Sequence, residues 1–168
     1  MVDGGQNEWY NIRVIKKGVV FLVMAGKSYS HQLDAKNRMR IPAKLREELG
    51  DNYTISIGAG GCLNVYTEAQ MKELKDTLKN VNPFRDKQLQ AARYILYYSW
   101  DAEEDNQGRI LIPENLRKYA KIEKNITVFK GPNCIEIWSD EVFNQYFNDV
   151  NFDTLADALD SMKQNGWA

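Results

Sequence analysis

The sequence predicts an α+β fold that is built from two similar halves. The first observation is a motif that occurs twice: Asp34–Arg38, followed by Ile-Pro and Leu-Arg, recurs 71 residues later as Asp105–Arg109 with the same followers. The second is a pair of strand-like segments that start at Cys62 and Cys134, 72 residues apart. The third is a set of helix-start signals between short runs of alternating apolar and polar residues. A register that persists over roughly thirty residues indicates a tandem duplication.

The first half is predicted to contain two hairpins with a short helix between them. Asp34 and Asn37 favour a turn, Pro42 suits the first position of a helix and Gly50 suits its end. A capping box that starts at Thr67 begins a second helix. The expected elements are strands at 29–33 and 38–41, a helix at 43–49, strands at 53–57 and 63–66, and a helix to about residue 78.

The second half repeats this order after a break at 80–83. Pro83 is expected to open a longer helix, whose apolar stripe is Leu89, Ala92, Ile95 and Leu96. The expected elements that follow are a turn at 105–108, a strand at 110–112, a helix from Pro113, strands at 126–129 and 134–138, a helix from Ser139, and an amphipathic helix at 154–163.

Each half is too small to bury its strands alone, so the second hairpin unit is expected to supply the partner within the same chain. We expect a first unit at 27–79, a linker helix at 80–99, a second unit at 100–150 and a C-terminal helix at 151–168. Residues 1–23 have no counterpart in the second half, and Met24 lies just before the first repeat. We therefore interpret Met24 as the natural start and residues 1–23 as a non-native or disordered extension.

The charge of the chain is uneven along its length. The formal net charge is −1, so the protein is not globally basic. Residues 27–50 contain six basic and three acidic side chains, whereas the matching residues 99–124 contain five basic and six acidic ones. A local basic face is sufficient for binding an anionic partner. The first repeat is therefore the half that is expected to face an anion.

The sequence lacks the residue patterns that several classes of protein function require. The chain has two cysteines without a Cys-x-x-Cys motif and the single histidine His31, so no metal site is expected. Cys62 and Cys134 are interpreted as small buried residues in a reducing compartment, with a disulfide between them as the alternative. The apolar run 19–25 is too short to span a membrane, and Gly58–Gly61 joins two strands rather than opening a phosphate-binding helix. We expect no enzyme activity and no cofactor.

The two Asp-x-x-x-Arg turns, each followed by Ile-Pro and Leu-Arg, resemble the MraZ transcriptional regulators of the AbrB/SpoVT swapped-hairpin superfamily. The resemblance covers about residues 24–150. It implies two tandem SpoVT-AbrB units that form one pseudo-symmetric β-barrel with short flanking helices. It also implies a bacterial, cytoplasmic and nucleoid-associated protein that forms ring-like homo-oligomers. Such proteins bind double-stranded DNA at repeated elements in the promoter of the division and cell-wall gene cluster.

The motif supplies the candidate site residues. Carried over by position, the DNA-binding candidates are Arg38 and Arg109, because arginine binds guanine or phosphate. The structural alternative is that each arginine pairs with the aspartate of its own motif and only braces the turn. The first turn has Asn37 where the second has Gly108, and asparagine is the next-best residue for positive φ. The remaining candidates are Lys36 and Arg40 as further DNA contacts, and Asp34 and Asp105 as supports of the turns.

Two other functions remain open: an antitoxin-like module that binds a protein, and a scaffold without a role on DNA. The aromatic cluster of Tyr94, Tyr97, Tyr98 and Trp100 is compatible with base stacking, but its place at the end of a long helix favours packing against the other half or another subunit. Because the first repeat is the more basic, we expect loss of Arg38 to weaken DNA binding more than loss of Arg109.

Overall fold

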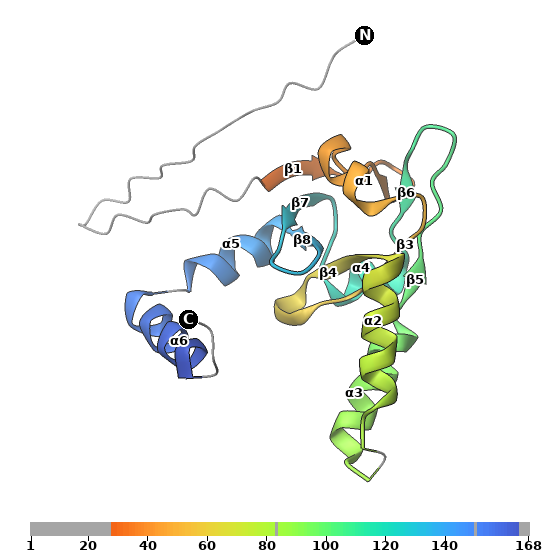
Figure 1. The fold of residues 1–168 in the computed structure, drawn as a ribbon. Coiled ribbons are helices and arrows are strands. Elements are labelled where there is room, and N and C mark those ends of the chain that lie inside the picture. Colours follow the sequence, from red (N-terminus) through yellow and green to blue (C-terminus); the bar gives the residue numbers. More distant parts are fainter. Residues whose placement is uncertain (1–27, 83, 150, 165–168) are drawn as a thin grey trace, which may run out of the picture.

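The structure is a computed structural model that describes residues 28–82, 84–149 and 151–164 (Figure 1). It combines antiparallel strands with several helices, which confirms the predicted α+β class. The interpretation of Met24 and of residues 1–23 lies outside the described residues. None of the helices within the described part is both long enough and apolar enough to cross a bilayer.

The elements follow the predicted order closely. The strands are β1 (Ser28–Gln32), β2 (Arg38–Met39), β3 (Tyr53–Ile57), β4 (Leu63–Thr67), β5 (Trp100–Asp101), β6 (Ile110–Leu111), β7 (Asn125–Lys130) and β8 (Ile135–Ser139). The helices are α1 (Ala43–Leu49), the 3-10 turn η1 (Ala59–Gly61), α2 (Glu68–Lys79), α3 (Asp86–Tyr97), α4 (Glu114–Tyr119), α5 (Asp140–Asn148) and α6 (Phe152–Gln164). Strand β5 was not predicted, because its two residues are too few to show an alternating pattern.

The two halves of the chain are interleaved. The larger sheet has six strands in the order β1-β7-β8-β4-β3-β5, and β2 pairs with β6 in a separate two-stranded sheet. Four of the pairings join the halves, namely β1 with β7, β2 with β6, β3 with β5 and β4 with β8. Among the strands of the described residues, the pairs β3–β4 and β7–β8 lie within one half. Neither half therefore completes its sheet without the other.

The sheet is open, which differs from the barrel that the resemblance implies. Strands β1 and β5 form its two edges among the described residues, and β2–β6 is not part of the same ladder. The physical reason lies in the length of β2 and β6, which have two residues each. Pro42 and Pro113 follow them closely and lack the backbone N–H that a longer ladder needs.

One core serves both halves. Ile55 and Val65 from the first half and Ile126 and Ile137 from the second are fully buried in the same apolar cluster. All five residues of β3 are buried, as expected for a strand that is covered on both faces. Folding of either half therefore buries side chains of the other.

The outer helices extend away from this core. The predicted capping box is present, since the Gln70 amide donates to Thr67 Oγ1 and the Thr67 amide donates to Gln70 Oε1. Helices α2 and α3 follow each other in the chain and form an arm that projects from the sheet (Figure 1). On the opposite flank, Phe143 and Phe147 of α5 pack on Trp138 of β8, with ring centroids 5.9 and 6.1 Å away.

The aromatic cluster is divided between core and surface. Tyr98 packs against the core and lies 6.2 Å from the ring of Tyr119 in the second half, in agreement with the predicted packing between halves. Tyr97 remains 76% exposed and Trp100 belongs to β5 rather than to the helix end.

Because the strands interleave, we expect a core cavity in one half to unfold the whole chain in one step. Ile126→Ala should lower the free energy of unfolding by about 2–5 kcal/mol through lost burial and the cavity it leaves. Leu111→Ala, at a 45% exposed position, is the matched control and should change it by about 0.5 kcal/mol or less. Urea unfolding followed by tryptophan fluorescence and by circular dichroism tests this. Two separate transitions would show that the halves fold independently.

Candidate functional site

Each motif aspartate holds its own turn closed. Asp34 Oδ1 accepts the backbone N–H groups of Lys36 at 2.8 Å and Arg38 at 2.9 Å. Asp105 Oδ1 accepts those of Gln107 at 2.9 Å and Arg109 at 3.0 Å. A carboxylate that accepts nearby backbone N–H groups is typical of an Asx turn. Each carboxylate therefore fixes the backbone of its own turn.

The two turns have the same backbone conformation despite their different residues. Asn37 has φ of 58° and Gly108 has φ of 69°, both in the left-handed region. The Asn37 amide donates to the Asp34 carbonyl at 2.9 Å, and the Gly108 amide donates to the Asp105 carbonyl at 2.8 Å. The prediction that asparagine preserves the turn is confirmed.

The interleaved strands bring both turns together into one network of four charged side chains. Arg38 contacts Asp34 through Nε and Nη2, at 3.0 and 2.9 Å, and donates from Nη1 to Asp105 at 2.9 Å. Arg109 contacts Asp105 through Nε and Nη2, both at 2.9 Å, and donates from Nη1 to Asp34 at 3.4 Å. Each arginine thus pairs with its own aspartate, as the structural alternative predicted, and also with the aspartate of the other half. We name Asp34, Arg38, Asp105 and Arg109 the paired-turn network.

The paired-turn network is electrically balanced and partly open to solvent. Its side chains are between 23% and 31% exposed, so each guanidinium keeps a surface that faces outward. The side-chain and backbone hydrogen bonds from Arg109 lower the pKa of Asp105 to about 2. Backbone and side-chain hydrogen bonds from Arg38 also lower the pKa of Asp34. Both carboxylates are therefore ionised at neutral pH and compensate the two arginines.

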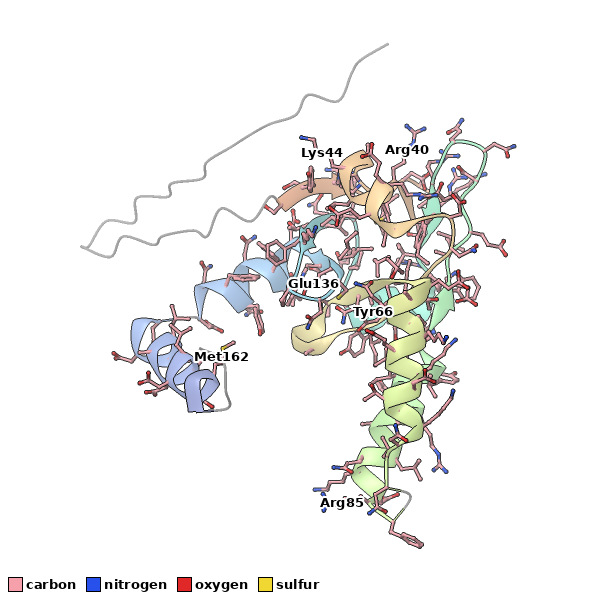
Figure 2. All side chains as sticks on the ribbon, viewed as in Figure 1. Arg40, Lys44, Tyr66, Arg85, Glu136 and Met162 are labelled. Atoms are coloured by element: carbon pink, nitrogen blue, oxygen red, sulfur yellow. The ribbon has the colours of Figure 1, made fainter. Side chains whose placement is uncertain are left out.

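The excess positive charge comes from residues beside the network. Lys36 and Arg40 are exposed, and the residues at the equivalent positions of the second half are Gln107 and Leu111. Figure 2 shows Arg40 at the same end of the molecule as Lys44, with both side chains pointing away from the sheet. The charge asymmetry of the repeats therefore lies in the neighbours of the two motif arginines. Arg38 and Arg109 themselves make similar contacts with the two aspartates.

The contacts of Glu104, the residue before Asp105, were not identified from the sequence. Glu104 pairs with Arg46 of α1 and accepts a hydrogen bond from the Tyr53 hydroxyl at 2.7 Å. The hydrogen bond from Arg46 lowers the pKa of Glu104, and burial raises that of Tyr53. These partners lie 51 and 58 residues apart, a separation that no local pattern reveals.

The cysteines and His31 do not form a reactive site. Cys62 is buried, Cys134 is half-buried and both are free thiols, so the disulfide alternative is not realised. Burial raises the pKa of each thiol to about 12, so both thiols are protonated at neutral pH. Burial lowers the pKa of His31. Within the described residues, His, Cys, Asp and Glu do not gather in groups of three or more that suit a metal.

We expect the paired-turn network to make the fold sensitive to acid. Carboxyl groups with a depressed pKa stabilise the folded state above their ordinary pKa, and this stabilisation is lost as the pH falls through the folded-state value. The free energy of unfolding should therefore fall as the pH drops from about 4 to about 2, the value of Asp105. Urea unfolding at a series of pH values measures this dependence.

Asp105→Asn removes one of the titrating groups, so this variant should lose less stability than the wild type over the same pH window. Asp51→Asn, at an exposed position outside the network, is the matched control. The same loss of stability in wild type and Asp105→Asn would contradict the assignment.

Comparison with known proteins agrees with this arrangement of two repeats. Residues 24–93 and 101–165 match the family described as "MraZ protein, putative antitoxin-like". Three similar proteins are each named Transcriptional regulator MraZ. The one from Thermoanaerobacter sp. (strain X514) is 43% identical over 137 residues, which are 80% of this chain and 95% of the relative. The one from Caldanaerobacter subterraneus subsp. tengcongensis is 41% identical over 136 residues, covering 79% and 94%.

The third relative, from Clostridium beijerinckii, is 38% identical over 136 residues, again covering 80% of this chain and 95% of its own length. The match extends over both repeats and nearly the full length of each relative. The chain therefore belongs to the MraZ family.

Proposed function

We propose that this chain is a transcriptional regulator that binds double-stranded DNA with the edge formed by the paired-turn network. The observation that carries the proposal is the meeting of both Asp-x-x-x-Arg turns at one edge, with Lys36 and Arg40 exposed beside them. The curated relatives bear the name of transcriptional regulators, which supports the same conclusion.

The arginines of the network keep hydrogen-bonding capacity for a ligand. A guanidinium has five N–H donors in a fixed plane. The contacts of Arg38 engage its Nε, Nη1 and Nη2, and each Nη carries a further N–H. Such donors can bind guanine O6 and N7 or a phosphate oxygen. The aspartates hold each guanidinium in place, so that little side-chain freedom is lost on binding.

The balance of charge within the network suits contact with a polyanion. Carboxylates alone would be repelled by phosphates, but here Arg38 and Arg109 compensate them. Lys36 and Arg40 then supply the net positive charge that attracts phosphates and releases counterions. The first turn is thus proposed as the stronger binding half.

We further propose the assembly that the family resemblance implies. A single copy presents few basic contacts, so it should bind weakly and with strong dependence on salt. A ring-like homo-oligomer places several such edges along one DNA molecule, and linked weak contacts give high avidity. Repeated elements in the promoter of the division and cell-wall gene cluster are the proposed target, in the cytoplasm and at the nucleoid. The interleaved halves are the proposed SpoVT-AbrB units at 27–79 and 100–150, joined by a linker helix at 80–99 and followed by a C-terminal helix at 151–168.

The alternative is a module that binds a protein, in line with the antitoxin-like wording of the family description. The two functions differ in their response to DNA. Lack of any preference for promoter over scrambled DNA at every salt concentration would favour the protein-binding alternative.

We expect Lys36→Ala and Arg40→Ala to weaken DNA binding at all sequences alike, because each side chain is proposed to contact phosphate. Each change should lower the slope of log affinity against log salt by about 1. Gln107→Ala, at the position equivalent to Lys36, is the matched control and should leave the slope unchanged. A salt titration with the region upstream of the protein's own gene measures both quantities. An unchanged slope in Lys36→Ala and Arg40→Ala would exclude these phosphate contacts.

Loss of a motif arginine should reduce the preference for promoter over scrambled DNA. Arg38→Ala is expected to weaken specific binding about tenfold to a hundredfold, as expected for the loss of a bidentate base contact. Arg109→Ala is expected to have a smaller effect, because Gln107 and Leu111 provide no charge beside it. Competition binding gives both values, with circular dichroism to confirm folding. Equal losses in the two variants would contradict the proposed asymmetry.

A further inference from the structure

The tip of the α2–α3 arm presents one aromatic side chain to solvent. Phe84 is 94% exposed, more than any other large apolar residue among those described. Asn82 forms a hydrogen-bonded turn with the residues after it, since the Phe84 amide donates to Asn82 Oδ1 at 2.9 Å and the Arg85 amide donates to the Asn82 carbonyl at 3.0 Å. This turn holds the Phe84 backbone at the end of the arm, with Arg85 and Lys87 next to it. An exposed aromatic that is held in a fixed place is suited to act as an anchor in an interface.

A pocket of about 280 Å³ lies on the opposite flank, between η1, the end of α4 and α5. Gly60 has φ of 76°, and a Cβ there would lie 2.8 Å from Tyr146 and 3.0 Å from Trp138. Glycine therefore permits the close packing that forms one wall. Small-molecule sites usually span about 300–1,000 Å³, so this pocket is suited to a single side chain. Its lining residues are Gly60, Gly61, Tyr119, Lys121, Val142, Gln145, Tyr146 and Asp149.

The surroundings of the tip and of the pocket have opposite charges. Residues 80–93 contain three basic side chains and one acidic side chain. Residues 140–164, which contain α5 and α6, hold six acidic side chains and one basic one. The pocket lining itself holds one charge of each sign, Lys121 and Asp149. Opposite fields of this kind steer two surfaces towards each other and disfavour contact between like surfaces.

The tip of the arm does not lie near the pocket of its own chain. The arm extends away from the sheet, whereas α5 lies on a separate flank (Figure 1). Figure 2 places Arg85 at the far end of the arm, away from the C-terminal helices that carry Met162. The complementary surfaces therefore suit contact between two copies of the chain.

We infer that Phe84 of one copy enters the pocket beside α5 of a second copy, with Arg85 and Lys87 facing the acidic C-terminal helices. This contact deepens the self-association proposed above and rests on it. Tyr146, 49% exposed at the pocket, offers its ring to the incoming aromatic side chain. The contact is head-to-tail, because each copy gives one tip and accepts one tip. Head-to-tail contacts form a ring if the rotation closes and an open filament if it does not.

The head-to-tail geometry permits a test by complementation. Phe84→Ala removes the tip side chain but leaves the pocket, and Val142→Arg blocks the pocket but leaves the tip. Each variant alone should be a monomer at concentrations where the wild type is an oligomer, with association weakened at least about tenfold. An equal mixture should form a dimer of twice the mass of one chain and no larger species. Light scattering after size-exclusion chromatography gives these masses.

Two further variants separate loss of the contact from loss of folding and from a general effect of surface changes. If Val142→Arg loses its circular dichroism spectrum, Gln145→Trp at an exposed position fills the same pocket from the surface. Leu111→Ala removes an exposed apolar side chain elsewhere and should leave the oligomer intact. An unchanged oligomer in Phe84→Ala, or a mixture of folded variants that stays monomeric, would overturn the inference.

Binding to promoter DNA is measured in parallel. A monomeric wild type that still binds the promoter specifically would refute the head-to-tail contact and leave the DNA-binding proposal standing. An oligomer that shows the expected complementation but no DNA preference would support the contact and refute the DNA-binding proposal.

Discussion

Pairing between the two repeats is the constraint on which the rest of the structure depends. Because β1 pairs with β7, β3 with β5 and β4 with β8, the buried side chains of both halves form one core. The same exchange pairs β2 with β6, which places Arg38 opposite Leu111. The two turns therefore meet because the strands that carry them are bound to each other. A single repeat would have neither a complete core nor a pair of turns.

The paired-turn network combines a structural and a proposed binding role in the same four side chains. Asp34 and Asp105 close the turns with one oxygen and hold both arginines with the other. This arrangement fixes the guanidiniums but neutralises them. In our proposal, the charge that attracts a polyanion comes from residues beside the network. There the first repeat has Lys36 and Arg40, where the second has Gln107 and Leu111. Duplication thus preserved the geometry of the turn, while the neighbouring positions diverged.

The outer helices have little part in the core and carry most of the large exposed apolar side chains. Phe84, Tyr94 and Tyr97 lie on the arm, and Tyr146 and Phe147 lie on α5. The tip of the arm has a net positive charge and the C-terminal helices have a net negative charge, so the two surfaces are complementary. The central sheet holds the two repeats together, while the peripheral helices carry the surfaces that we propose for contact between copies of the chain.

The sequence by itself determined the duplication, the α+β class, the positions of the turns and the left-handed residue in each. These are local properties, set by the conformational preferences of Asp, Asn, Gly and Pro and by the alternation of apolar residues. It also identified the four residues of the paired-turn network. Only the tertiary structure decided that each arginine bridges both aspartates, that Glu104 joins Arg46 and Tyr53, and that the sheet stays open. These features depend on which distant strands pair, and strand pairing is governed by packing of the whole chain, which no local window of sequence contains.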